Sequence, residues 1–295
     1  MVGKNREKII FLMFFAIILF SCQTAPKTLD ISLDDGYLPL EGGAYAYLIA
    51  EKDALPVLKQ IMFNDINHKQ IQQMIDQTNL AAAAVYVTPN EETGKSTSRY
   101  RLTAWGNYPA SYAKMAFGSS KEWKKQRSAL SGYDYWHSPQ NGLSIALTGG
   151  IALVATSGAG AQEPPDPFSA APGTEIPEGF DAFREGSILA CWIDNPAAAI
   201  SKRIAQMGVP LEIPAQRLFI SLFRLDEQKY IAHLQIQLPS ASHAGMLTVM
   251  FAFARNFLPP ELSANLPEQD GNNLNITTAP LTIGEIALLL KTFSL

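Results

Sequence analysis

The chain has 295 residues, of which 47% are hydrophobic, and its 23 Lys and Arg against 27 Asp and Glu give a net charge of −4. This acidic balance argues against nucleic acid as a partner, and against membrane binding driven mainly by anionic headgroups. The only cysteines are Cys22 and Cys191, so no disulfide framework is expected and the fold depends on its apolar core. The length suits one large domain or two small ones.

The first 22 residues have the pattern of a signal peptide. Three basic residues precede an unbroken apolar run from Ile9 to Phe20, which is shorter than the about 20 residues of a membrane-spanning helix. The run ends in Leu19-Phe20-Ser21-Cys22, which resembles the lipobox of bacterial lipoproteins, and the bulky Phe20 resembles spirochaete versions of it. This resemblance implies that Cys22 becomes the mature N-terminus and carries palmitate or a similar acyl chain. The alternatives are an uncleaved signal anchor and a cleaved signal peptide in which Cys22 is incidental.

A polar tether, residues 23–36, precedes the first predicted α+β unit, residues 37–158. Within this unit, Tyr100, Leu102 and Ala104 alternate with polar residues, which is typical of a half-buried strand in a hairpin. We predict, in chain order, a strand over 44–50, helices over 53–62 and 69–77, a hairpin of 80–88 with 99–105, a helix over 109–123, and strands over 133–137, 143–148 and 151–156.

The second unit, residues 180–295, repeats this order. We predict a strand over 187–193, a helix opening at Asn195-Pro196, a hairpin of 217–225 with 229–238, a helix over 242–258, and a copy of the apolar segment 150–154 at 285–289. The chain is therefore predicted to contain internally duplicated β-α-β-β-α-β units of the α+β class, with a mostly antiparallel sheet and helices packed on its faces. Two unrelated α+β halves are the alternative.

Residues 159–179, between the two units, are rich in proline, glycine and alanine. Because proline interrupts helices and central strands, we predict an extended, mobile linker. A proline-rich ligand for a partner's groove is the alternative.

No motif in the sequence supports catalysis, a metal site or a cofactor. The four histidines lack the spacing of a zinc site, and Ser111-x-x-Lys114 lacks the companion motifs of serine acyl enzymes. Gly158-Ala-Gly160 is followed by prolines instead of the helix that a phosphate loop needs. We therefore expect a protein that is not an enzyme, and we expect Cys191 to be a small buried residue.

The segment 242–258 is predicted to form a helix that is apolar on all sides. Such a helix is either deeply buried or in contact with a membrane, and this one is too short to cross a bilayer, so it would lie in the interface. The candidate lipid-contacting residues, with two from the corresponding first-half helix at the end, are Met246, Leu247, Met250, Phe251, Phe253, Phe257, Met115 and Phe117. The alternative is a core helix packed on the sheet.

The lipobox at Cys22, the polar tether, the α+β body and the apolar helices together resemble the treponemal outer-membrane lipoproteins that face the periplasm and insert amphipathic helices into the membrane. The resemblance implies a non-enzymatic protein that is anchored in the envelope, at the outer membrane, by its acylated cysteine. It also implies that the protein binds membrane lipid or an amphiphile and alters permeability. The acidic charge implies that such binding comes from apolar burial. The alternative function is a lipid-tethered module that binds an envelope protein, with the apolar helices as its core.

Overall fold

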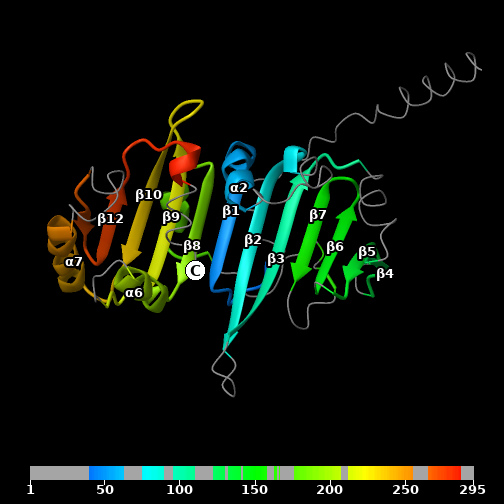
Figure 1. Cartoon of the computed structure of the whole chain (residues 1–295), viewed down its shortest axis with the longest axis horizontal. Helices are drawn as coiled ribbons and strands as arrows, with labels where there is room; N and C mark the ends of the chain where they lie inside the picture. Colours follow the sequence, from blue (N-terminus) through cyan, green and yellow to red (C-terminus); the bar gives the residue numbers. More distant parts are fainter. Residues whose placement is uncertain are drawn as a thin grey trace, which may run out of the picture. The chain divides into compact units, whose positions relative to one another are not determined.

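An antiparallel sheet of 12 strands runs through both halves of the part of the chain that the computed structural model describes (Figure 1). That part comprises residues 40–62, 75–89, 96–109, 122–129, 132–140, 142–157, 163–164, 166, 176–206, 212–254 and 265–286. All of these residues belong to one unit, Ile31–Leu295.

The first half contributes seven strands. They are β1 (Ala46–Glu51), β2 (Thr78–Pro89), β3 (Ser96–Gly106), β4 (Lys124–Arg127), β5 (Asp134–Ser138), β6 (Leu143–Thr148) and β7 (Ala152–Ser157). The predicted hairpin is confirmed as β2 and β3, with Leu102 opposite Ala83. After β1 come a short 3-10 helix, η2 (Lys52–Ala54), and the helix α2 (Leu55–Met62). The predicted helix over 109–123 lies mostly outside the described residues, as does most of the one over 69–77.

Among the described residues, the second half contributes five strands and, before a short helical turn at 283–286, three helices. They are α5 (Phe180–Arg184), β8 (Leu189–Asp194), α6 (Ala197–Gln206), β9 (Arg217–Arg224), β10 (Tyr230–Gln237), α7 (Ala241–Ala254), β11 (Glu268–Asp270) and β12 (Asn273–Thr277). The hairpin of β9 with β10 was predicted from the sequence, whereas α5, β11 and β12 were not.

The predicted match of 285–289 to the strand segment 150–154 is wrong at its start, because residues 283–286 are helical. Thr282 and Glu285 form a capping box, in which the Thr282 N–H donates to Glu285 Oε2 over 2.7 Å and the Glu285 N–H donates to Thr282 Oγ1 over 3.3 Å. This exchange satisfies N–H groups that a helix start leaves unpaired, so the local sequence favours a helix here.

The strand order is mirrored about the junction between β1 and β8. From one edge to the other it is β11-β12-β10-β9-β8-β1-β2-β3-β7-β6-β5-β4. Outward from β1 the strands are β2, β3, β7 and β6, and outward from β8 they are β9, β10, β12 and β11. In Figure 1, α2 lies at one end of the strands and α6 at the opposite end. The halves therefore share a topology, to which the first half adds β4 and β5.

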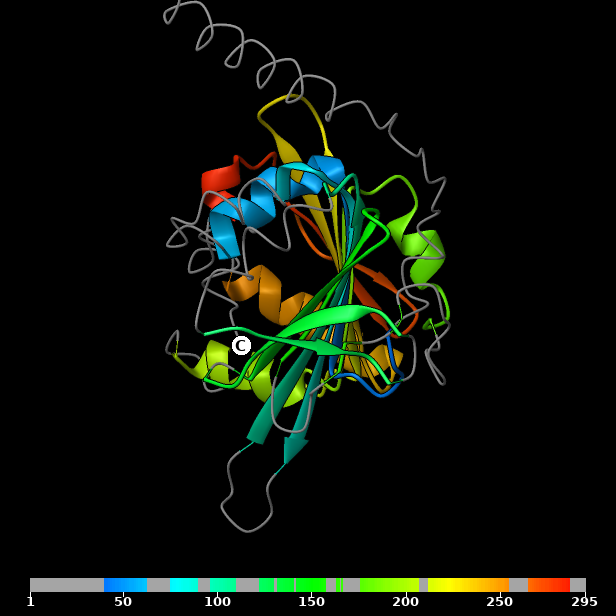
Figure 2. The ribbon, with the colours of Figure 1, turned by 90° about the vertical axis from the view of Figure 1, so that its right-hand side faces the viewer.

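The two faces of the sheet are covered by different helices (Figure 2). On β1, Leu48 faces the same side as α2, while Tyr47 faces the other side, because side chains alternate along a strand. α2, α6 and α7 pack on the first side, which we call the helix face. On the opposite face, Phe180 of α5 packs edge-on against Trp192 with ring centres 4.7 Å apart. Tyr47 stacks on the same Trp192.

Parts of the predicted linker pack on the sheet. Pro164 is buried and its carbonyl oxygen accepts a hydrogen bond from the Tyr133 hydroxyl. Pro177 is also buried, and Ile176 packs against the cluster around Trp192. These contacts hold parts of the predicted linker, residues 159–179, against the rest of the protein. The boundaries of the two predicted units stay a prediction.

Candidate functional site

The helix α7 lies at the β12 end of the sheet (Figure 1). It begins at Ala241, one residue earlier than the sequence predicted. The Ser240 hydroxyl bonds to His243 Nδ1 over 2.8 Å and accepts a weaker bond from the His243 N–H over 3.4 Å, as an N-cap residue does. From Ala241 to Ala254 the helix carries no Asp, Glu, Lys or Arg. Its placement on the protein therefore depends on apolar contacts.

One side of α7 belongs to the protein core. Ala244 and Leu247 are completely buried, in a cluster with Ile236 on β10 and Leu274 on β12. Two further predicted site residues, Met250 and Phe251, are partly buried against the same cluster. Leu247, predicted as a lipid contact, is therefore a core residue that does not reach the surface.

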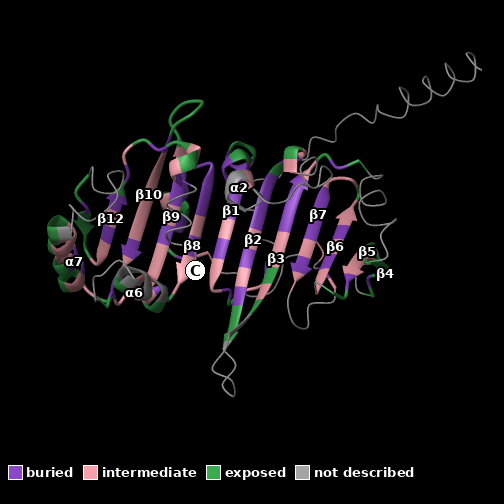
Figure 3. Cartoon of the chain, in the orientation of Figure 1, coloured by how far each residue is buried: buried purple, intermediate pink, exposed green. Residues whose placement is uncertain are grey.

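The other side of α7 faces solvent, and Figure 3 marks exposed positions on this helix. Met246, Val249 and Phe253 are 48%, 54% and 79% exposed. Their spacing of three and then four residues places them on one side of the helix. We call these three residues the α7 stripe. Val249 was missing from the predicted set, and Phe257, Met115, Phe117 and Cys22 lie outside the described residues.

The middle of the helix face is apolar and only partly covered. Leu48 on β1, Cys191 on β8 and Ile220 on β9 are neighbours in register, and all three are half-buried. Val85 on β2 lies on the same face and is also half-buried. Burial raises the pKa of the Cys191 thiol to about 12. The thiol is therefore neutral at physiological pH, as for a small apolar residue, although Cys191 is half-buried and not fully buried as predicted.

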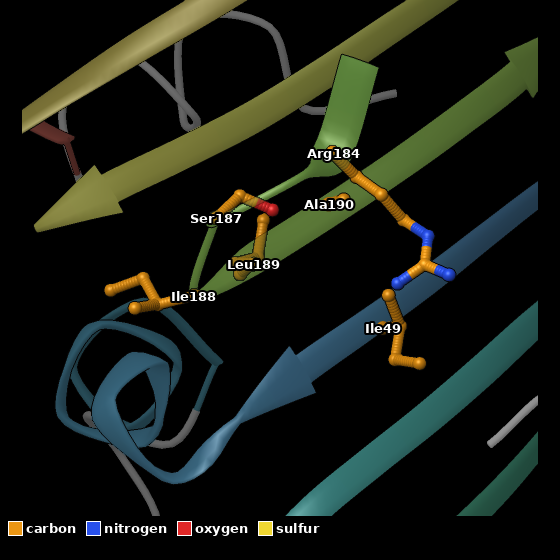
Figure 4. Close-up of a pocket in the computed structure, with 6 residues that line it drawn as sticks. All are labelled: Ile49, Arg184, Ser187, Ile188, Leu189 and Ala190. Atoms are coloured by element: carbon orange, nitrogen blue, oxygen red, sulfur yellow. The ribbon is translucent and has the colours of Figure 1, made fainter. Parts of the chain in front are cut away.

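A shallow pocket on the opposite face does not offer a ligand site (Figure 4). It is lined by Arg184 and Ser187 with Ile49 and residues 188–190, and it leaves no room for a water-sized molecule. The buried Arg184 guanidinium is already paired with Asp181, 2.9 Å away. Both residues belong to α5, so this ion pair lies within the helix.

The described residues contain no helix that is long and apolar enough to span a membrane. They also contain no group of three or more His, Cys, Asp or Glu that could hold a metal ion. Of the sites predicted from the sequence, the exposed apolar side of α7 is the one that the described residues support as a candidate site.

Comparison with known proteins gives a family and two similar folds. A family model described as "Outer membrane-associated lipoprotein TP0453" matches residues 41–258. Crystal form I of TP0453 has a TM-score of 0.60 at 18% identity and covers 90% of this chain and 98% of that one. Crystal form III has a TM-score of 0.61 at 17% identity and covers 91% and 99%. No curated protein sequence matches the chain.

Proposed function

We propose, for a chain that belongs to the TP0453 family of outer membrane-associated lipoproteins, that it binds membrane lipid through the α7 stripe and is not an enzyme. Family membership confirms the resemblance to spirochaete lipoproteins and the lipid-anchored, outer-membrane location that the sequence predicted. Family membership does not give the contact with lipid, an effect on permeability or the acyl group on Cys22, and these are part of the proposal.

The observation that carries the proposal is the exposure of Met246, Val249 and Phe253 on a helix without charge. Soluble proteins seldom leave a run of large apolar side chains in water unless the run meets a partner. Burying the exposed parts of these three side chains is worth roughly 3–5 kcal/mol. That corresponds to weak binding, near the millimolar range. The stripe therefore needs a second attachment.

Acylation at Cys22 supplies that attachment. Acyl chains add about 0.8 kcal/mol per buried methylene and hold the protein at the bilayer surface. There the local concentration of lipid around α7 is high, and a weak contact becomes populated. The stripe then sets the orientation of an anchored protein instead of causing its attachment.

The partly covered helix face extends the proposal to a bound amphiphile. Leu48, Val85, Cys191 and Ile220 form an apolar surface on which an acyl chain finds only apolar partners. Binding of a fatty acid, followed by fluorescence displacement of a dye-labelled chain, tests this extension. Charged substitution at Val85 is expected to abolish displacement, and unchanged displacement would remove the extension.

The alternative function is an interaction module in which the α7 stripe docks on an envelope protein. Liposome flotation of protein lacking residues 1–22 discriminates the two, because only the polypeptide's own affinity remains. At millimolar lipid we expect a fraction of the protein to float and Phe253→Asp to abolish flotation while the fold persists. Leu225→Asp is the matched control, since Leu225 is 55% exposed on the turn between β9 and β10. Protein that stays soluble at every lipid concentration favours the interaction module.

We infer that the two halves arose by internal duplication. The mirrored strand order about β1 and β8, and the positions of α2 and α6 at opposite ends of the strands, support this inference. Superposition of β1, β2, β3 and β7 on β8, β9, β10 and β12 tests it, and a failure of the strands to overlap in that order would reject it.

A further inference from the structure

Two arginines on β3 share one carboxylate where the described chain begins. Arg99 Nη2 lies 2.9 Å from Glu41 Oε2, and Arg101 Nη2 lies 2.5 Å from Glu41 Oε1. Arg99 and Arg101 are two residues apart on the strand and therefore lie on the same face, the one that α5 covers elsewhere. Among the described residues neither arginine has a second acidic partner. The three side chains thus carry a net charge of +1.

The Glu41 carboxylate does not provide acceptors for all hydrogen-bond donors of Arg99 and Arg101. Arg101 has a side chain only 14% exposed, and its Nε–H is buried without a hydrogen-bond partner among the described atoms. A buried guanidinium N–H without an acceptor is costly, because desolvation is not repaid. An anion with several acceptor oxygens repays this cost better than one carboxylate shared between two arginines.

The Arg99 guanidinium is held in place and open to solvent. Its central carbon lies 4.3 Å from the centre of the Tyr86 ring, a cation–π contact that fixes the plane of the group. The Arg99 side chain is 31% exposed. A ligand can therefore approach Arg99 from solvent without unfolding the sheet.

The Glu41 carboxylate can leave without releasing its backbone. The Glu41 carbonyl oxygen accepts hydrogen bonds from the Tyr47 hydroxyl over 2.8 Å and from the Tyr86 hydroxyl over 2.7 Å. The preceding Leu40 is completely buried in the core. These contacts fix the segment, so rotation of the half-exposed Glu41 side chain is enough to uncover the two arginines.

We propose that Arg99 and Arg101 form a binding site for a phosphate group, which the Glu41 carboxylate occupies when no ligand is present. Guanidinium groups bind phosphate oxygens in pairs, and two of them suit a phosphate monoester or diester. The ligand is a lipid headgroup or a free phosphate compound. The site shares no residue with α7 and does not depend on the lipid contact proposed there.

Calorimetric titration of the full chain in detergent, with inorganic phosphate and with glycerol 3-phosphate, tests the site. Glu41→Gln removes the charge that competes with phosphate for the two arginines. Phosphate binding is expected to tighten about ten-fold, because phosphate no longer has to displace a charge-assisted hydrogen bond of about that strength. Arg101→Gln is expected to abolish binding. If that variant fails to fold, the more exposed Arg99→Gln carries the test, with a loss of about ten-fold or more.

Arg127→Gln on β4 is the matched control, because Arg127 is an exposed cation on the edge strand. The proposal is overturned if neither the wild type nor Glu41→Gln releases or absorbs heat at about 10 mM phosphate, a concentration far above the dissociation constant of a specific site. An equal loss in Arg127→Gln also overturns it, since binding would then reflect surface charge alone. Phe253→Asp should leave the titration unchanged, which separates this site from α7.

Vesicles identify the source of the phosphate. Competition by phosphatidylglycerol vesicles against glycerol 3-phosphate supports a lipid headgroup. Binding of the soluble compounds without competition from the vesicles supports a free phosphate compound. Phosphatidylcholine vesicles are the comparison, because they carry the same phosphate without net charge.

Discussion

Leu247 and Phe253 lie six residues apart on α7, and the first is completely buried while the second is 79% exposed. Six residues turn a helix by about 240°, which separates the two side chains by about a third of the circumference. One apolar helix thus contributes to the core with Leu247 and to the surface with Phe253. Substitutions at these positions should therefore differ in effect.

Leu247→Ala is expected to lower the free energy of unfolding by about 2–5 kcal/mol, because it leaves a cavity in the cluster around Leu274. Phe253→Ala should change it by about 0.5 kcal/mol or less, as at other exposed positions. Urea unfolding followed by circular dichroism measures both. Equal losses would show that Phe253 is packed in solution, which would remove the α7 stripe.

Cys22→Ser is expected to abolish acylation. Metabolic labelling with a fatty-acid analogue should mark the wild type, which should fractionate with membranes. Cys191→Ser is the control and should keep the label, because the Cys191 thiol lies within the sheet between β1 and β9. Label that persists in Cys22→Ser would contradict the lipobox assignment.

Two glutamates should respond to pH with opposite signs. Burial raises the pKa of Glu51 above its ordinary 4.5, so its favourable contribution to stability is present at low pH and is lost as the pH rises through the raised pKa. The Thr282 N–H and hydroxyl lower the pKa of Glu285, so its contribution is present above 4.5 and is lost as the pH falls through the lowered pKa.

Unfolding of Glu51→Gln and Glu285→Gln across the acid range measures these contributions. Relative to the wild type, Glu51→Gln should gain stability as the pH rises from 4 towards 7. Glu285→Gln should be at a disadvantage at pH 7 that shrinks well below 4.5. Parallel pH profiles for the two variants would contradict the assigned environments.

Gly106→Ala is expected to destabilise the end of β3. A β-carbon at this position would lie 2.1 Å from the carbonyl oxygen of Gln77, and the backbone there cannot move without disturbing the β2–β3 ladder. Overpacking of this kind costs on the order of 1–3 kcal/mol. Gly284→Ala is the control, because the nearest atom lies 3.9 Å away. A neutral result for Gly106→Ala, measured by urea unfolding, would mean that the strand end relaxes freely.

The hairpins could be predicted because their apolar residues alternate. In β3, Leu102 and Ala104 face α2's side of the sheet, and this period of two appears directly in the sequence. β11 and β4 could not be predicted in the same way. All residues of Glu268–Asp270 and Lys124–Arg127 are exposed, so these edge strands have no buried side to leave an apolar pattern.

The helix of the candidate site was predicted from the sequence, but which side of it is exposed was not. A helix that has polar residues on one side reveals its buried side. α7 carries no charge, and its polar residues Ser242, His243 and Thr248 are spread around the helix, so they do not mark the exposed side. Leu247 and Met246 are adjacent and equally apolar, and only the strands β10 and β12 decide which of them is covered. The orientation therefore depends on tertiary contacts that no local pattern records.

The pairing of β1 with β8 has a consequence for export. Leu48 pairs with Cys191 across about 140 residues of chain, so the first strand keeps an open edge until the second half has crossed the inner membrane. An unpaired strand edge is a template for pairing with other chains. Newly exported chains should therefore depend on periplasmic holding factors until residues 189–194 arrive, and truncation before Leu189 should yield aggregates instead of a stable half.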